Sequence, residues 1–135
     1  MPETQAIAKI IEGLVQDERN AQIFYGHLSK IAPAGHIATA LSDIANDNIS
    51  HTHKFTQLLT KQFGNNFTPA EAEINTGLEL KDALALALGE ENKTLRVLAG
   101  LLEDVANTES EKVIQRVINK KIVNYHQLER LYTLS

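Results

Sequence analysis

The sequence contains no cysteine and no tryptophan, and only three of its 135 residues are proline. The absence of cysteine excludes disulfide bonds, thiolate chemistry and iron–sulfur clusters held by this chain. The prolines stand at positions 2, 33 and 69, so long stretches can form uninterrupted helices. No stretch approaches the ~20 apolar residues of a membrane-spanning helix, and no signal-peptide pattern is visible. We therefore expect a cytoplasmic protein that makes no use of a membrane.

Basic charge is also scarce. The net charge is -4, and Lys120-Lys121 is the only adjacent basic pair. Nucleic acid is therefore not an expected partner. The length fits one domain over residues 1–135 with a substantial core. Leu, Ile and Ala dominate and aromatic residues are only 5%, a composition that favours helix over sheet.

Apolar residues recur at spacings of three and four residues in four segments, which predicts four amphipathic helices. The first is expected over about 3–31 and the second over about 36–63, ending at Gly64 as a C-cap. Capping-box patterns at 76–79 and 108–111 are expected to open the third and fourth helices. A similar pattern at 68–71, with Pro69 at the first helical position, predicts a helical turn inside the preceding link.

The connections between these helices limit the possible topologies. The short break at 32–35 makes the first two helices an antiparallel hairpin. The link over about 64–76 can reach ~43 Å when extended. That length is close to the roughly 40 Å of a helix of this size. The link can therefore cross the length of an all-α bundle of two antiparallel hairpins, while up-down-up-down connectivity remains the alternative.

Polar residues interrupt the apolar stripe near the middle of every predicted helix. In chain order they are Glu18, Asn48, His51, Glu91, Lys121 and Asn124. Burying an unpaired charge costs several kcal/mol, so groups at one height are expected to face each other. The arrangement also repeats, because one Glu precedes a polar pair by 30 residues in each half. Each pair has i, i+3 spacing, which places both members on one helix face.

This arrangement resembles the rubrerythrin and ferritin-like di-iron carboxylate family, and the resemblance covers nearly the whole chain. Glu18, Ala21 and Tyr25 are similar to the Glu-x-x-Ala-x-x-x-Tyr stretch of the first rubrerythrin helix. Asn48 and His51, preceded by Ile44-Ala45, resemble the family's Ile-Ala-x-x-Glu-x-x-His. The resemblance implies a ferritin-like four-helix bundle with one Glu on two helices and a Glu-x-x-His pair on the other two.

The departures from this pattern affect the metal ligands. Asn48 replaces one bridging Glu, and Lys121-x-x-Asn124 stands where the second Glu-x-x-His is expected. A rival alignment would present Val123 and His126 to the core. It breaks the 30-residue repeat and turns His126 away from the apolar stripe at ~100° per residue. Lys121 and Asn124 are therefore the predicted core residues.

Two functional hypotheses follow. In the first, Lys121 lies between Glu18 and Glu91 and forms a metal-free ionic cluster, so that no cofactor or enzymatic activity is expected. In the alternative, Glu18, His51 and Glu91 remain as ligands of iron or manganese in an oxidoreductase or iron-handling protein. A two-metal oxidase or peroxidase is a further possibility. Helical bundles of this kind often self-associate, so a homodimer is also predicted.

The remaining candidates are interpreted as peripheral. His53 is expected at the surface, and His27 and His36 are expected as surface or capping groups near the first turn. Asp47 and Glu90 lie toward the edges of their helix faces and are predicted to be solvated acids. The Tyr25 hydroxyl is expected to point toward the polar layer.

Overall fold

The protein's structure is a computed structural model that describes residues 4–33 and 35–135. Its helices are α1 (Thr4–Ile31), α2 (Gly35–Phe63), α3 (Leu80–Asp104) and α4 (Glu109–Leu134). The four predicted helices are confirmed, and the described residues contain no strand. The expected start at Glu3 lies outside the described residues. Gly64 ends α2 as predicted, with a φ of 69° that suits glycine.

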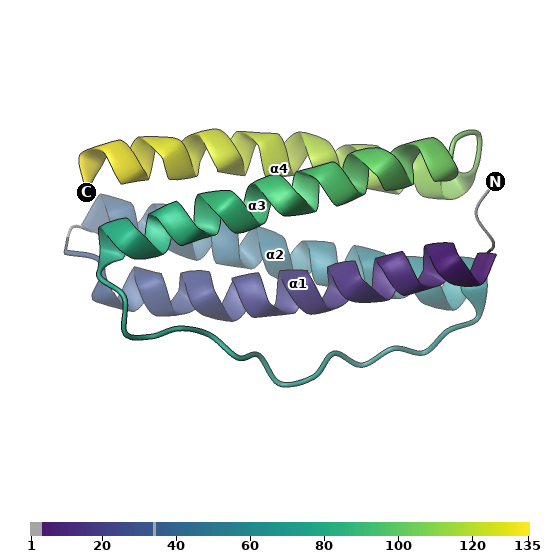
Figure 1. The fold of residues 1–135 in the computed structure, drawn as a ribbon, viewed down its shortest axis with the longest axis horizontal. Coiled ribbons are helices and arrows are strands. Elements are labelled where there is room, and N and C mark those ends of the chain that lie inside the picture. The colour runs from purple at the N-terminus through teal and green to yellow at the C-terminus, as the bar shows by residue number, and fades with distance from the viewer. Residues whose placement is uncertain (1–3, 34) are drawn as a thin grey trace.

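The four helices lie side by side as two antiparallel hairpins, α1 with α2 and α3 with α4 (Figure 1). The link over 64–79 leaves the end of α2 and runs the length of the bundle to the start of α3 (Figure 1). Helices α2 and α3 therefore point in the same direction. The crossover connection is confirmed, and the up-down-up-down alternative is wrong.

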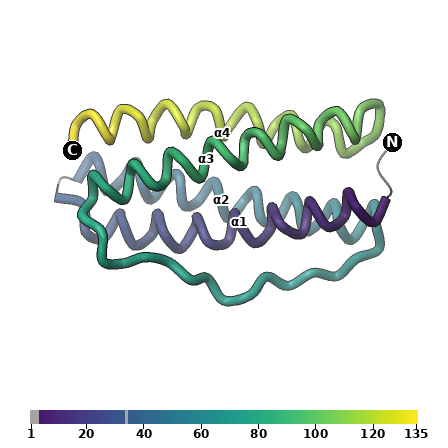
Figure 2. Tube along the Cα trace, in the orientation of Figure 1, coloured from purple at the N-terminus to yellow at the C-terminus, as the bar shows by residue number. Residues whose placement is uncertain are grey.

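The crossover link is extended along α1 rather than helical (Figure 2). The Gln16 side chain of α1 accepts a hydrogen bond from the Ala70 backbone N–H at 2.7 Å and donates one to the Ala70 carbonyl oxygen at 3.1 Å. Phe67 packs against the apolar core from the same link. The predicted helical turn at 68–71 is therefore wrong, because contacts with α1 hold this segment open.

The two other capping boxes also differ from prediction. Helix α3 begins at Leu80 instead of the pattern at 76–79, where the Asn75 side chain accepts a hydrogen bond from the Gly77 N–H at 2.9 Å. Helix α4 does begin directly after Thr108. However, the Thr108 hydroxyl makes no cap bond, and the Glu111 carboxylate accepts the Asn107 N–H at 2.6 Å. The start is correct, while the side-chain pairing is shifted by one residue.

Two apolar clusters fill the bundle, one toward each end. The first joins the early part of α1 and the late part of α2 to the end of α3 and the start of α4. The second joins the opposite ends of the same helices. The interrupting polar residues lie between these clusters in the sequence of every helix. The fold therefore places a polar layer at the middle of the bundle, enclosed on both sides by hydrocarbon.

Candidate functional site

Six polar side chains make up this layer, which we call the waist layer. They are Glu18, Asn48, His51, Glu91, Lys121 and Asn124, and every one is buried. Glu18 and Lys121 are each only 1% exposed. Since all four helices contribute, the sequence prediction that these groups meet at one height is confirmed.

The Lys121 ammonium lies between the two buried carboxylates. Its Nζ atom is 2.5 Å from Glu18 Oε2, and 3.1 Å and 3.0 Å from Glu91 Oε1 and Oε2. A lysine ammonium has three N–H donors and no acceptor. These three contacts therefore account for its whole donor capacity and tie α4 to both α1 and α3.

The second oxygen of Glu18 is bonded to α2. Glu18 Oε1 lies 2.8 Å from His51 Nδ1 and accepts a hydrogen bond from Asn48 Nδ2 at 3.3 Å. Glu18 thus contacts Asn48, 30 residues later, just as Glu91 contacts Lys121, 30 residues later. The internal repeat read from the sequence corresponds to the same contact between equivalent helices of the two hairpins.

Asn124 differs from this pattern. Its Nδ2 donates a hydrogen bond to Asp47 Oδ2 at 3.2 Å, and Lys120 Nζ lies 3.6 Å from the same oxygen. Asp47, predicted to be a solvated acid, therefore links α2 to α4 at the edge of the waist layer. Asp47 directly precedes Asn48 in the sequence, and Lys120 directly precedes Lys121. These matching positions beside core residues are the sequence signal for the Asp47–Lys120 pair.

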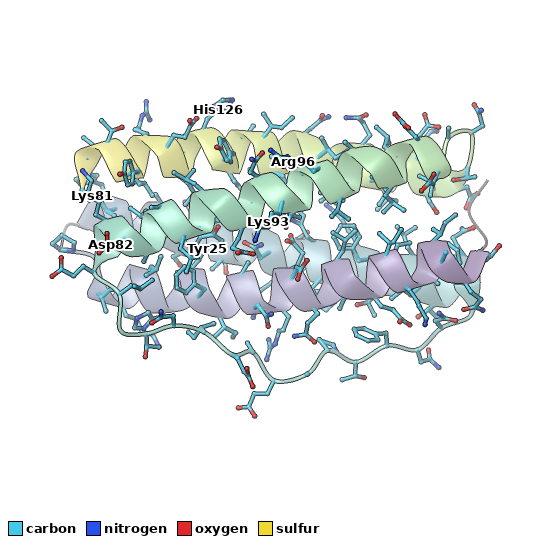
Figure 3. The ribbon with its side chains drawn as sticks, viewed as in Figure 1. Tyr25, Lys81, Asp82, Lys93, Arg96 and His126 are labelled. Carbon is cyan, nitrogen blue, oxygen red and sulfur yellow. The ribbon has the colours of Figure 1, made fainter. Side chains whose placement is uncertain are left out.

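The rival alignment of α4 is wrong, because Val123 is 59% exposed and the His126 side chain is 71% exposed. His126 lies on the outer side of α4 and contacts Glu129 (Figure 3). His53 and His36 are exposed as predicted. His27 is half-buried, and its Nε2 atom is buried without a hydrogen-bond partner, so the prediction of a surface or capping group is incomplete.

Burial and neighbouring charges have opposing effects on the pKa values of Glu18 and Lys121. Burial raises the pKa of Glu18, but the charge of Lys121 and the hydrogen bond with His51 outweigh it, so the pKa falls below its ordinary value. Burial lowers the pKa of Lys121, and the charges of Glu18 and Glu91 more than reverse this effect. Lys121 is therefore held as a cation at neutral pH.

The pKa of Glu91 is shifted in the opposite direction to that of Glu18, to above its ordinary value. Burial raises its pKa, and the repulsion from Glu18 adds to this effect, so that Lys121 and a hydrogen bond with Tyr25 only partly compensate. Tyr25 lines the same pocket as Glu18 and Glu91, which agrees with the expectation that its hydroxyl lies toward the waist layer. Burial and the nearby charges of Glu91 and Glu18 raise the pKa of Tyr25 well above its ordinary value. The phenol is therefore neutral and available as a donor.

A pocket of about 210 Å³ reaches the waist layer from the side. Helices α1 and α3 form its walls, and residues 73–75 of the crossover link border its outer edge. Glu18, Glu91 and Tyr25 line its inner part, and Tyr25 lies between the two helices (Figure 3). Sequence reasoning missed this pocket, because it depends on where the non-helical link lies.

The waist layer contains fewer acidic and imidazole side chains than a di-iron centre of a four-helix bundle uses. Such a centre uses four Glu and two His ligands from the four helices. The equivalent positions here supply two carboxylates and one imidazole, and the ammonium of Lys121 contacts both carboxylates. Asn48 Oδ1 is buried without a partner, but an amide oxygen is a weak ligand for iron. Within residues 4–33 and 35–135, no three His, Asp or Glu side chains converge as metal ligands.

Solved structures share this architecture. A ferritin-like diiron-carboxylate protein from Thermotoga maritima has a TM-score of 0.79 and 16% identity, over 94% of both chains. Bacterioferritin from Desulfovibrio desulfuricans, described with its diiron site in different catalytic states, has a TM-score of 0.85 and 16% identity. That similarity covers 96% of this chain and 79% of the bacterioferritin chain. A scan against protein-family models and a search of curated proteins give no match.

Proposed function

We propose that this chain, which has the ferritin-like four-helix fold, is a binding protein rather than a di-iron enzyme. In this proposal the ammonium of Lys121 takes the place that metal cations hold in di-iron bundles. The observation that carries the proposal is the bridging position of Lys121 Nζ between Glu18 and Glu91. The protein then keeps the fold and its buried carboxylates and performs no metal-centred redox reaction.

The charges of the waist layer support this proposal. A di-iron centre brings about four positive charges, which four carboxylates balance. Here the change at two positions to Asn48 and Lys121 removes two negative charges and adds one positive charge relative to a pair of glutamates. Two carboxylates remain, and the ammonium contacts both of them. Fewer acids and a fixed internal cation together reduce the attraction for a metal ion.

Elemental analysis of protein purified without chelators, from cells grown with added iron and manganese, tests the proposal. We expect less than about one metal atom in ten chains, because a bound cation would have to displace the Lys121 ammonium from both carboxylates. One or two iron atoms per chain would overturn the proposal.

A second candidate is a single iron or manganese ion held by Glu18, His51 and Glu91 after Lys121 swings aside. It is favoured by one observation: Glu18 contacts His51 directly, and both glutamates reach one common atom. This candidate predicts tight, stoichiometric Mn²⁺ binding by the wild type that is lost in Glu18→Ala. The exposed control Glu103→Ala should then keep the metal.

A further inference from the structure

The pocket between α1 and α3 is strongly acidic. Five of its lining residues are carboxylates: Asp17, Glu18, Glu73, Glu90 and Glu91. In the part of the chain that the structure describes, neither lysine nor arginine lines it. Lys93 contacts Glu90 at 3.5 Å, but both side chains are largely exposed, so this pair neutralises little. An anionic ligand would be repelled from this pocket, and a cation would be attracted.

The carboxylates at the inner end of the pocket share one lysine ammonium. Glu18 and Glu91 share the single ammonium of Lys121, whose three donors are all used. Glu18 and Glu91 are only 1% and 4% exposed, so water screens their charges weakly and they act on a ligand in the pocket more strongly than surface acids do.

Much of the remaining lining is apolar and aromatic, beside the polar side chains of Asn20, Asn75 and Thr94. Phe24 and Tyr25 line one wall with their ring centroids 6.1 Å apart, and Ile74, Leu86 and Ala87 contribute hydrocarbon. A volume of about 210 Å³ corresponds to roughly seven water molecules at ~30 Å³ each. Such a space suits a short aliphatic chain, whose methylene groups pack on the rings while its charged end meets carboxylates.

The lining favours an organic cation over a metal ion. A divalent metal needs several ligand atoms that converge at ~2 Å. The described residues place no three acidic or imidazole side chains in that arrangement. A primary ammonium needs only hydrogen-bond acceptors at ~2.8 Å, which separately placed carboxylates and the side-chain amides of Asn20 and Asn75 can provide.

We propose that this pocket binds a short aliphatic amine or diamine, with its ammonium group directed toward Asp17, Glu90 and the Glu18–Glu91 pair. The link residues Glu73, Ile74 and Asn75 line the pocket and would contact the part of the ligand farthest from the waist layer. The inference deepens the proposed function and rests on it, because a metal between Glu18 and Glu91 would compete with an organic cation for these carboxylates.

Isothermal titration calorimetry with butane-1,4-diamine tests the inference, and butane-1,4-diol serves as the uncharged control of equal length. We expect saturable binding of one diamine per chain and no binding of the diol. The double variant Asp17→Asn/Glu90→Gln should lose at least about tenfold in affinity, since two charge-assisted contacts are removed. The exposed control Glu103→Gln should bind as the wild type does.

A second variant distinguishes binding inside the pocket from non-specific electrostatic attraction to the acidic surface. Ala21→Leu narrows the pocket without changing its charge, so diamine binding should weaken at least about tenfold while circular dichroism shows an intact bundle. Absence of diamine binding, equal binding of the diol, or equal losses in Glu103→Gln and the double variant would overturn the inference. Metal analysis of the same samples keeps the two proposals distinguishable. Metal-free protein that fails to bind diamine contradicts this inference alone, whereas stoichiometric metal contradicts the proposed function.

Discussion

Lys121 is the residue on which the waist layer depends, because both buried carboxylates use its ammonium. Replacing it with methionine nearly keeps the side-chain length but leaves two buried carboxylates without their shared cation. Removal of one partner from a buried ion pair costs about 3–5 kcal/mol. We therefore expect Lys121→Met to lower the free energy of unfolding by about this amount in urea denaturation.

The neighbouring Lys120 provides a matched control. Its side chain is 50% exposed and lies 3.6 Å from Asp47. Exposed pairs of this kind contribute ~0–1 kcal/mol, so Lys120→Met should change stability by no more than that. Equal effects of the two substitutions would show that the ammonium of Lys121 is not the buried centre of the cluster.

The two glutamates should affect the pH dependence of stability with opposite signs. The pKa of Glu18 lies below its ordinary value of 4.5, so its contribution is present above pH 4.5 and is lost as the pH falls through the folded-state pKa. The pKa of Glu91 lies above 4.5, so the folded state takes up this proton first. Stability that depends on Glu91 therefore rises as the pH falls toward 4.5.

Urea denaturation from pH 3 to 7 measures both effects. The stability difference between the wild type and Glu18→Gln should shrink below pH 4.5. The difference between the wild type and Glu91→Gln should instead shift in favour of the wild type as the pH falls from 7 toward 4.5. Parallel curves for the two variants would contradict the assigned pKa directions.

For individual residues, the sequence predicted which polar side chains are buried but not all of their hydrogen-bond partners. Helical periodicity predicts the burial of Glu18, His51, Glu91 and Lys121, because each lies between apolar residues on one helix face. The bond from Asn124 to Asp47 does not follow from periodicity. It depends on a side-chain rotamer at the edge of a helix face, where several directions are sterically open.

Among the structural elements, the crossover link is held against α1 in part by the side chain of Gln16. The Gln16 side chain makes two hydrogen bonds with the Ala70 backbone, at 2.7 Å and 3.1 Å. Gln16→Ala should lower the free energy of unfolding by about 1–2 kcal/mol at most, since each partly exposed bond contributes ~0.5–1.5 kcal/mol. Its main effect should be local opening of the link.

Hydrogen exchange read by mass spectrometry distinguishes these effects. Peptides that contain residues 64–79 should exchange faster in Gln16→Ala, while peptides from α3 and α4 stay unchanged. Gln115→Ala is the matched control, because the Gln115 side chain bonds only to Asn119 within its own exposed helix face. Unchanged exchange at Ala70 in Gln16→Ala would show that this contact does not hold the link.

The sequence predicted the helices more accurately than the link. Long apolar stripes and Gly64 located the helices and the end of α2. The capping patterns at 68–71 and 76–79 were misleading, because a four-residue pattern carries little free energy compared with contacts to a neighbouring helix. Phe67 and the Ala70 backbone are held by such contacts in an extended chain.

At the scale of the whole molecule, the 30-residue repeat and the antiparallel arrangement within each hairpin describe the same feature. Glu18 meets Asn48, and Glu91 meets Lys121, because the two members of each pair lie nearly equally far along the chain from the turn of their hairpin. The sequence was therefore sufficient to locate the waist layer. It could not select the crossover, since the link was long enough for either topology. That residues 1–135 form one domain, and that the chain dimerises, remain predictions.

Within the described residues, no helix is long and apolar enough to span a membrane.

Both proposed functions are compatible with the ferritin-like fold. Only the contents of the waist layer can distinguish a metal enzyme from a binding protein. Shape alone does not make this distinction, because the similarity at 16% identity establishes the fold and not the ligands. The proposal of a binding protein rests on the contact of one ammonium with two carboxylates.

The most direct test is a crystal structure of the protein grown with Fe²⁺ and Mn²⁺, with anomalous data collected at both absorption edges. We expect no anomalous peak among Glu18, His51 and Glu91, and density for Lys121 Nζ within hydrogen-bond distance of both carboxylates. An anomalous peak between Glu18 and Glu91, with the Lys121 side chain displaced, would show that the waist layer is a metal site.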